Sequence, residues 1–160
     1  RTQEISRLIG RSLRSCVNLK KLGERQITID CDVINADGGT RTAGVTGGFV
    51  ALALALKKLH DVAEVREFPL ANYVAAVSVG LDEENGDKLL DLDYDEDSRI
   101  GTDMNFVMNS ERAFIEVQGT AEKKPFSRQD LNDMMNLAEK ACGELFLKQQ
   151  EIIGSFFKLP

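Results

Sequence analysis

The sequence has 160 residues and a mass of 17.7 kDa, which is enough for one compact domain and too little for a second independent core. Apolar residues make up 42% of the chain and charged residues 29%, so collagen-like, disordered and membrane-spanning proteins are poor matches. The net charge of −6 is uneven, because residues 1–25 hold seven basic and two acidic side chains, a charge of +5, which leaves −11 on the other 135. A basic end of this kind can bind a polyanion or contact the acidic part of a second copy.

The cysteines and the apolar runs indicate the cellular compartment of the protein. Cys16, Cys31 and Cys142 are widely spaced and form no CxxC pair, which favours reduced thiols in a cytoplasm over disulfides or a zinc site. The longest apolar run, residues 49–56, is far shorter than the ~20 residues of a membrane helix, and no segment has the layout of a signal peptide. We therefore expect a cytoplasmic protein without a membrane partner.

The first half of the chain alternates between helical and strand patterns. Apolar residues at helical spacing predict a helix over 2–19, with Arg7, Arg11 and Arg14 on another face. Residues 26–34 alternate between apolar and polar, which predicts a half-buried strand. Residues 45–58 are apolar nearly all round, as is typical of a buried helix.

The second half predicts a sheet followed by a long helix. A charged connection over 61–70 leads to strands at 73–81 and 89–94, joined by an acidic hairpin turn, and two further strands follow at 104–108 and 113–117. Ser127 with Asp130 three residues later resembles a capping box at the start of the last helix. This order predicts an α+β fold in which a mixed β-sheet is layered with helices.

A glycine-rich turn between the strand at 26–34 and the buried helix is the first candidate site. Gly38 and Gly39 let the backbone approach a ligand, and the amides at a helix start carry about +0.5 of a charge, which suits an anion. Thr40 adds a hydroxyl and Arg41 a planar fork for two phosphate oxygens. An ordinary tight turn with a threonine cap and a surface arginine remains an equal alternative. The lysine of a GxxxxGK[ST] loop is absent, so a nucleotide triphosphatase is not supported.

An acidic stretch over 91–103 is the second candidate. It does not fit a calcium loop beginning at Asp91, because Glu96 and Thr102 occupy the positions that need glycine and glutamate. Alternation along the strand predicts that Asp91, Asp93 and Asp95 form its solvated face. Asp97 and Asp103 lie on either side of a turn and could converge on one magnesium ion, which takes one or two carboxylates plus phosphate oxygens.

Histidine and cysteine chemistry is not favoured. His60 is the only histidine and follows the end of a helix, where a cation is a routine structural choice. Cys31 and Cys142 fall within apolar patterns and are interpreted as packing residues.

Three long motifs, in the same order and over most of the chain, resemble the bacterial ribonuclease PH family. They are residues 1–14, residues 29–43, and the stretch 90–105 with Leu90-Asp91-Leu92-Asp93-Tyr94 and Thr102-Asp103-Met104-Asn105. The resemblance implies a ribonuclease PH-like fold and a phosphorolytic 3′-to-5′ exoribonuclease, a tRNA nucleotidyltransferase that trims tRNA precursors. It implies Mg²⁺ as cofactor, inorganic phosphate as co-substrate with release of nucleoside diphosphates, and a homo-hexamer built as a trimer of dimers.

The resemblance also implies roles for residues of both candidate sites. Phosphate would be held by Arg1, Gly39, Thr40 and Arg41. The catalytic, metal-binding residues would be Asp97 and Asp103. The alternative is a catalytically silent ring subunit or RNA-binding scaffold of an exosome-type assembly, and the presence of Arg41 with both aspartates argues against it.

Two departures from the family pattern set further expectations. The family has a segment before the position of Arg1, with the first strands of the domain and a basic loop that grips tRNA, so we expect residues 1–160 to be a single domain that is incomplete at its N-terminus. Ile100 stands where the family usually has alanine, close enough to Asp97 to disturb the turn.

Overall fold

Four antiparallel strands form the centre of the structure, a computed structural model that describes residues 2–157. The strands are β1 (Val74–Leu81), β2 (Lys88–Leu90), β3 (Thr102–Asn109) and β4 (Phe114–Ala121), and their order in the sheet is β2-β1-β3-β4. Each neighbouring pair is antiparallel, so the run of antiparallel strands and the α+β class expected from the sequence are confirmed. The expected mixed sheet is corrected to an antiparallel one, because the described residues contain no parallel pair.

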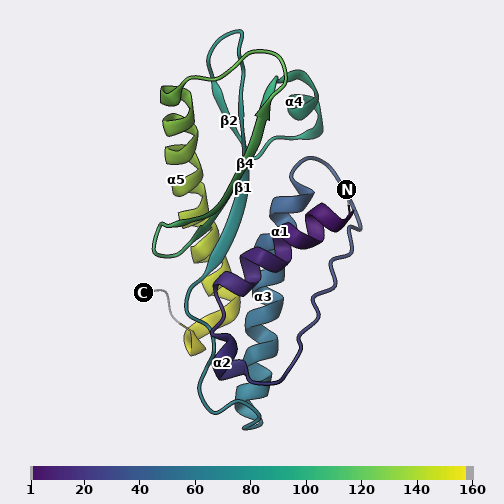
Figure 1. The fold of residues 1–160 in the computed structure, drawn as a ribbon, viewed down its shortest axis with the longest axis vertical. Coiled ribbons are helices and arrows are strands. Elements are labelled where there is room, and N and C mark those ends of the chain that lie inside the picture. Colours follow the sequence, from purple (N-terminus) through teal and green to yellow (C-terminus); the bar gives the residue numbers. More distant parts are fainter. Residues whose placement is uncertain (1, 158–160) are drawn as a thin grey trace.

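Two long helices, α3 (Thr40–Asp61) and α5 (Arg128–Ile153), pack on β1 from different sides (Figure 1). All eight residues of β1 are buried, which matches its continuous apolar pattern. Thr46 Oγ1 of α3 accepts from the amide of Ala76 (3.1 Å) and donates to its carbonyl (3.3 Å). The short strand β2 pairs with β1 only at residues 79–81, so it does not cover this part of the edge of β1. Gln149 Nε2 of α5 donates to the carbonyls of Thr46 and Val74, so one buried polar cluster joins both helices to the sheet.

The helix α3 is long and apolar enough, by length and composition, to cross a membrane. In the structure its apolar side chains Val45, Phe49, Ala53 and Leu56 are fully buried in the domain core. Packing against the sheet and against α1 (Thr2–Ser15) therefore accounts for one side of α3, whereas Leu54 on another side is 44% exposed, so the helix is not buried all round.

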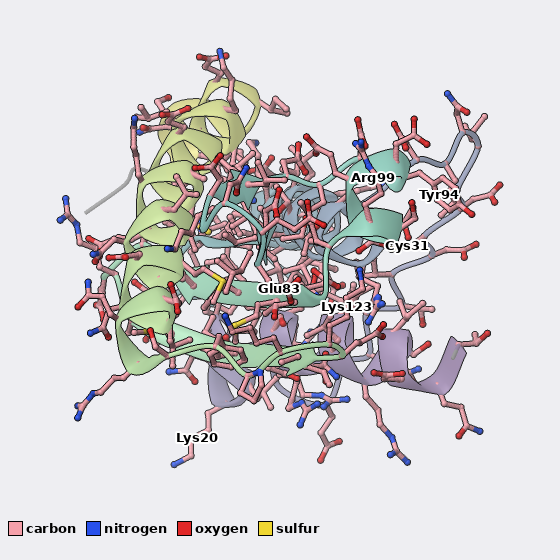
Figure 2. All side chains as sticks on the ribbon, turned by 90° about the horizontal axis from the view of Figure 1, so that it is seen from above. Lys20, Cys31, Glu83, Tyr94, Arg99 and Lys123 are labelled. Atoms are coloured by element: carbon pink, nitrogen blue, oxygen red, sulfur yellow. The ribbon has the colours of Figure 1, made fainter. Side chains whose placement is uncertain are left out.

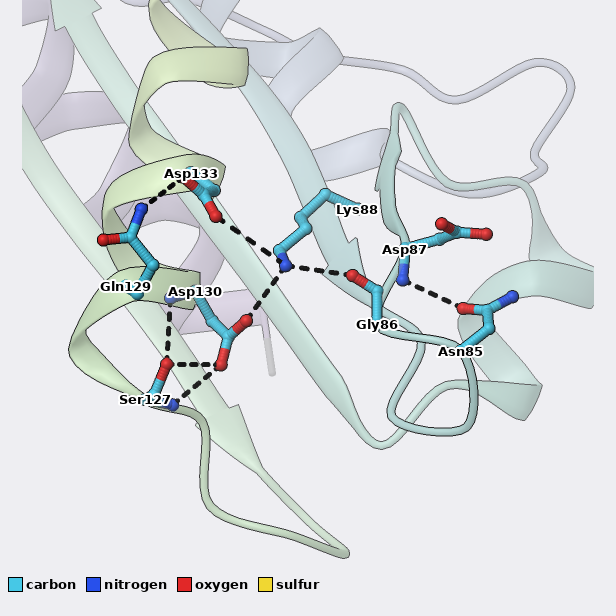
Figure 3. A network of polar contacts seen from close by, with 8 residues as sticks. All are labelled: Asn85, Gly86, Asp87, Lys88, Ser127, Gln129, Asp130 and Asp133. Atoms are coloured by element: carbon cyan, nitrogen blue, oxygen red, sulfur yellow. Dashed lines mark hydrogen bonds and ion pairs between the residues drawn. The ribbon is translucent and has the colours of Figure 1, made fainter.

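The long last helix begins as expected (Figure 3). The Ser127 side chain accepts from the Asp130 amide, and the Asp130 carboxylate accepts from the Ser127 amide, which is a complete capping box. Lys88 of β2 pairs with Asp130 (Nζ to Oδ1, 2.9 Å) and so ties the sheet edge to the helix start. At the other end of α5, a short 3₁₀ helix, η1 (Gly154–Phe156), leads to Phe157, whose ring stacks on Tyr73.

The first helix is shorter than predicted. It ends at Ser15, and a separate turn of helix, α2 (Leu19–Leu22), follows. Asn18 caps α2 by accepting from the amides of Lys20 and Lys21, and Val17 forms an isolated bridge with Leu70. A good N-cap residue and a bridge partner therefore divide the periodic segment.

The prediction of a strand over 26–34 was wrong. The segment is not part of the sheet, and Val33 and Ile34 are 56% and 96% exposed. A strand needs a neighbour for its backbone hydrogen bonds, and none of the described residues lies beside this segment as a paired strand. Alternation alone therefore did not make a strand here.

The predicted strand at 89–94 is also shorter, because β2 ends at Leu90. Asp91 has a positive φ of 57°, and a short helix, α4 (Tyr94–Arg99), follows. Asp93 caps α4, and Glu96 completes a capping box. Asp91, Asp93 and Asp95 consequently do not share a strand face, because the capping signal Asp93-x-x-Glu96 overrides the alternation.

Candidate functional site

The glycine-rich turn packs closely against residues 92–94, the segment that leads into α4. A Cβ on Gly38 would stand only 1.8 Å from the carbonyl oxygen of Leu92. The Asp37 carboxylate accepts from the amide of Tyr94 (2.8 Å), the first residue of α4. The turn that begins α3 and the segment that begins α4 are thus one packed unit, although they are more than 50 residues apart in sequence.

The first turn of α3 presents free donors. Gly39 is its N-cap and has the left-handed φ of 69° that a glycine adopts at little cost. The expected threonine cap is absent, because Gly39 is the N-cap and no side chain of the described residues accepts a hydrogen bond from the first amides of α3; the Thr42 hydroxyl instead donates to the Gly39 carbonyl (2.8 Å). Within the described residues, Arg41 takes part in no ion pair and the Thr40 hydroxyl in no hydrogen bond. The helix start, with one half-buried guanidinium, suits an anion.

The two aspartates come from different elements. Asp97 is an exposed residue of α4, and Asp103 is a half-buried residue of β3, opposite Gly80 of β1 and Thr120 of β4. Burial raises the pKa of Asp103, the negative charge of Asp97 raises it further, and the guanidinium of Arg41 lowers it. Asp103 is therefore within electrostatic range of both Asp97 and Arg41, which relates the two candidate sites through this one carboxylate.

The surroundings of Asp103 fit a cation. Its Oδ1 atom is buried and has no hydrogen-bond partner among the described residues, which is costly for a carboxylate oxygen. No group of three or more histidine, cysteine or acidic side chains suitable for a metal occurs in residues 2–157. A site in which two carboxylates bind the metal, and water and phosphate supply the other ligands, is typical of Mg²⁺. It differs from a site in which the protein supplies all the ligands.

Of the six residues expected to form the site, Gly39, Thr40 and Arg41 are consecutive at the start of α3, and Asp103 lies within electrostatic range of Arg41 and Asp97. Arg1, the sixth, lies outside the described residues.

Ile100 fits its surroundings. It is half-buried, and its Cδ1 would lie 2.1 Å from a Cβ placed on Gly80, so the side chain fills the space that this glycine leaves open. Ile100 is also the C-cap of α4, and its amide donates to the Glu96 carbonyl (3.1 Å).

Two residues that contact the site backbone were not expected from the sequence. Ser78 Oγ accepts from the amide of Leu92 (3.2 Å), and Glu83 of the acidic hairpin accepts from Gly101 and Thr102. These hydrogen bonds join residues that are 14 to 19 positions apart in the sequence, and no spacing rule predicts such contacts.

Models of one protein family match most of the chain. The domain 1 model of the 3′ exoribonuclease family matches residues 1–58, and the domain 2 model of the same family matches residues 72–141. The glycine-rich turn lies in the first match and both aspartates in the second.

Relatives of known name are similar over nearly the whole chain. Ribonuclease PH of Bdellovibrio bacteriovorus is 68% identical over 159 residues, which cover 99% of this chain and 65% of the relative. Ribonuclease PH of Bacillus subtilis is 54% identical over 154 residues, which cover 96% of this chain and 62% of the relative. The chain therefore spans slightly less than two thirds of the length of these relatives.

Solved structures share the fold at low sequence identity. The crystal structure of Rrp46 from rice (Oryza sativa) has a TM-score of 0.67 and 15% identity, with 95% of this chain and 65% of that chain covered. The Archaeoglobus fulgidus exosome with RNA bound to the active site has a TM-score of 0.65 and 16% identity, with 91% and 60% covered.

Proposed function

This chain belongs to the 3′ exoribonuclease family, and from that premise we propose that it carries the reaction centre of a phosphorolytic 3′-to-5′ exoribonuclease. The proposed substrates are the 3′ ends of tRNA precursors and inorganic phosphate, and the products are nucleoside diphosphates. The relatives named ribonuclease PH support this assignment, and so does one observation above all: Arg41 and the unpartnered carboxylate of Asp103 lie within electrostatic range.

The proposed reaction needs little covalent chemistry from the protein. The amides at the start of α3 and the side chains of Thr40 and Arg41 would hold the phosphate, with Arg1 adding charge. An oxygen of the hydrogen phosphate ion attacks the last internucleotide phosphorus in line, and the bond from phosphorus to the 3′ oxygen breaks. The proton of the attacking phosphate passes to the leaving 3′ oxygen with the help of the Asp97 or Asp103 carboxyl group, so the shortened RNA leaves with a 3′ hydroxyl. Asp97 and Asp103 would hold Mg²⁺, which when bound stabilises negative charge on the reacting phosphoryl group.

The assembly and location belong to the same proposal. RNA is the proposed macromolecular partner, the proposed oligomer is a homo-hexamer built as a trimer of dimers, and the cytoplasm is the proposed compartment. The similarity to exosome structures also raises the alternative of a silent ring subunit. The presence of the complete set Arg41, Asp97 and Asp103 favours the enzyme.

The test uses the full-length protein that contains this chain. Arg41→Ala should abolish phosphate-dependent shortening of a tRNA precursor, because removing one preorganised charged donor costs about 10²-fold or more in rate. Arg66→Ala is the matched control, since Arg66 is an exposed arginine of the charged connection. Release of nucleoside diphosphate is the readout. Trimming by Arg41→Ala at the wild-type rate would mean that the glycine-rich turn is only a turn.

A further inference from the structure

The turn between α4 and β3 determines how Asp97 and Asp103 are placed relative to one another. Asp97 lies before the turn and Asp103 after it, and residues 98–102 form the link. A change in the conformation of this link would change the separation of the two carboxylates, so the groups that hold the turn matter for whatever the aspartates bind.

One carboxylate holds this turn from the side of the β1–β2 hairpin. Glu83 Oε2 accepts from the amide of Gly101, and Glu83 Oε1 accepts from the hydroxyl of Thr102, both at 3.1 Å. Thr102 is fully buried and Glu83 half-buried, so these charge-assisted hydrogen bonds are partly shielded from solvent. A Cβ on Gly101 would stand 2.3 Å from Glu83 Oε1, so the close approach requires a glycine here.

The opposite side of the turn is held by the end of β4. The amide of Glu122 donates to the carbonyl of Gly101, and Lys123 Nζ donates to the carbonyl of Arg99, both at 2.6 Å. Glu83, Arg99 and Lys123, labelled in Figure 2, come from three separate segments that meet at this turn. The turn is therefore clamped between the hairpin and β4, and Glu83 is the only one of these groups that binds both Gly101 and Thr102.

We propose that Glu83 is a positioning residue of the reaction: its carboxylate fixes Gly101 and Thr102 so that Asp97 and Asp103 meet one Mg²⁺ and the reacting phosphate in a single geometry. This inference rests on the proposed function. Both oxygens of Glu83 already accept hydrogen bonds from the turn, so Glu83 acts through the backbone that bears Asp103 and not as a metal ligand. Residues that orient metal ligands in this way typically change metal affinity or activity by 10- to 100-fold when removed.

The experiment compares three variants of the full-length protein. Glu83→Ala removes both acceptors, and Glu83→Gln keeps the length of the side chain and one acceptor for the Gly101 amide. Glu84→Ala changes the exposed neighbour in the same hairpin and is the control. For each protein we would measure kcat, KM for phosphate, the Mg²⁺ concentration for half-maximal rate, deuterium uptake of the peptide containing residues 100–103, and the melting temperature.

Glu83→Ala should lower kcat about 10- to 100-fold and raise the Mg²⁺ requirement, with KM for phosphate within about twofold, because the phosphate turn of α3 is untouched. Deuterium uptake at residues 100–103 should increase, Glu83→Gln should restore part of the rate, and Glu84→Ala should match the wild type. If Glu83→Ala fails to fold, Gly101→Ala tests the same contact with Glu83 in place, since the new methyl group displaces the carboxylate, and it should reproduce the loss.

The outcomes separate this inference from the proposed function. A wild-type protein without phosphate-dependent release would overturn the proposed function and this inference with it. An active wild type, with unchanged kcat, Mg²⁺ requirement and deuterium uptake in Glu83→Ala, would overturn this inference alone. Equal loss of kcat in Glu83→Ala and Glu84→Ala would also overturn it, because the effect would then belong to the hairpin as a whole.

Discussion

At the residue scale, the carboxylate of Asp103 is held at a cost to stability. Burial and the charge of Asp97 raise its pKa in the folded protein above the unfolded value. The folded state therefore binds the proton more tightly than the unfolded state, and the ionised form at neutral pH lowers the free energy of unfolding. Carboxyl groups whose pKa is perturbed by burial and by a neighbouring charge are typical of functional sites.

Neutral substitution of the two aspartates should separate stability from activity. Asp103→Asn should leave the melting temperature equal or higher, because the charge that is costly in the folded state is removed. Asp97→Asn at an exposed position should change stability by no more than ~0.5 kcal/mol. If both bind magnesium, each variant should lose phosphorolysis by ~10²-fold or more. Nucleoside diphosphate release measures activity and thermal melting measures stability, both on the same preparations. Normal release from both variants would refute the metal assignment.

At the scale of elements, the site depends on how closely the start of α3 approaches the start of α4. Gly38→Ala places a methyl group against the carbonyl of Leu92, which is backbone and cannot rotate away. We expect a loss of about 1–3 kcal/mol of stability, typical of overpacking, together with weaker phosphate dependence of the reaction.

The matched control lies in α3, the helix that follows the turn. A methyl group at Gly47→Ala meets no atom of the described residues within 4 Å, and alanine in a helix interior is more stable than glycine by about 0.5–1 kcal/mol. Denaturant unfolding of both variants is the measurement. A destabilised Gly47→Ala, or an unaffected Gly38→Ala, would contradict the packing of the turn described above.

The contact between β2 and α5 makes the stability of the protein depend on pH in the acidic range. Hydrogen bonds from Ser127 and the charge-assisted contact with Lys88 hold the pKa of Asp130 well below its usual range. A depressed folded pKa contributes stability that is fully present above the unfolded pKa of ~4 and is lost as the pH falls below it. Asp130→Asn should therefore flatten the fall of melting temperature below pH 4. Asp133→Asn, whose carboxylate lies 3.8 Å from Lys88 Nζ, is the control and should keep most of that fall.

The sequence predicts the elements whose signals are local and misses those that depend on distant partners. The capping box at Ser127 and the turn at 82–87 are complete within a few residues, and both are confirmed. The strand at 26–34 needed a partner strand, and alternation does not reveal whether one is present. The candidate site shows the same division: the residues of the glycine-rich turn are predicted from local chemistry, whereas Glu83 depends on a contact across the fold that the sequence does not reveal.

At the scale of the whole molecule, the uneven charge is partly neutralised within the chain. Arg11 of α1 pairs with Glu116 of β4 (Nε to Oε2, 3.3 Å), and Gln118 of the same strand donates to Glu4. Arg7 and Arg14 are exposed and form no ion pair with the residues that the structure describes. The free part of the predicted basic face therefore consists of Arg7 and Arg14.

The last prediction concerns what this basic face contacts. A ring of identical chains needs complementary surfaces, and residues 26–160 of another copy carry the net negative charge. We therefore expect Arg7→Glu and Arg14→Glu, alone or together, to lower the mass measured by light scattering for the full-length protein, most strongly at low salt, where the repulsion between exposed like charges is least screened. Arg11→Glu is a poorer probe, because it also breaks the contact with Glu116.

Lys20→Glu is the control, since Lys20 is an exposed cation of α2 and not of this face. An unchanged mass together with weaker binding of a tRNA precursor would assign Arg7 and Arg14 to RNA instead, because each phosphate contact that is lost lowers the affinity and its salt dependence without affecting assembly.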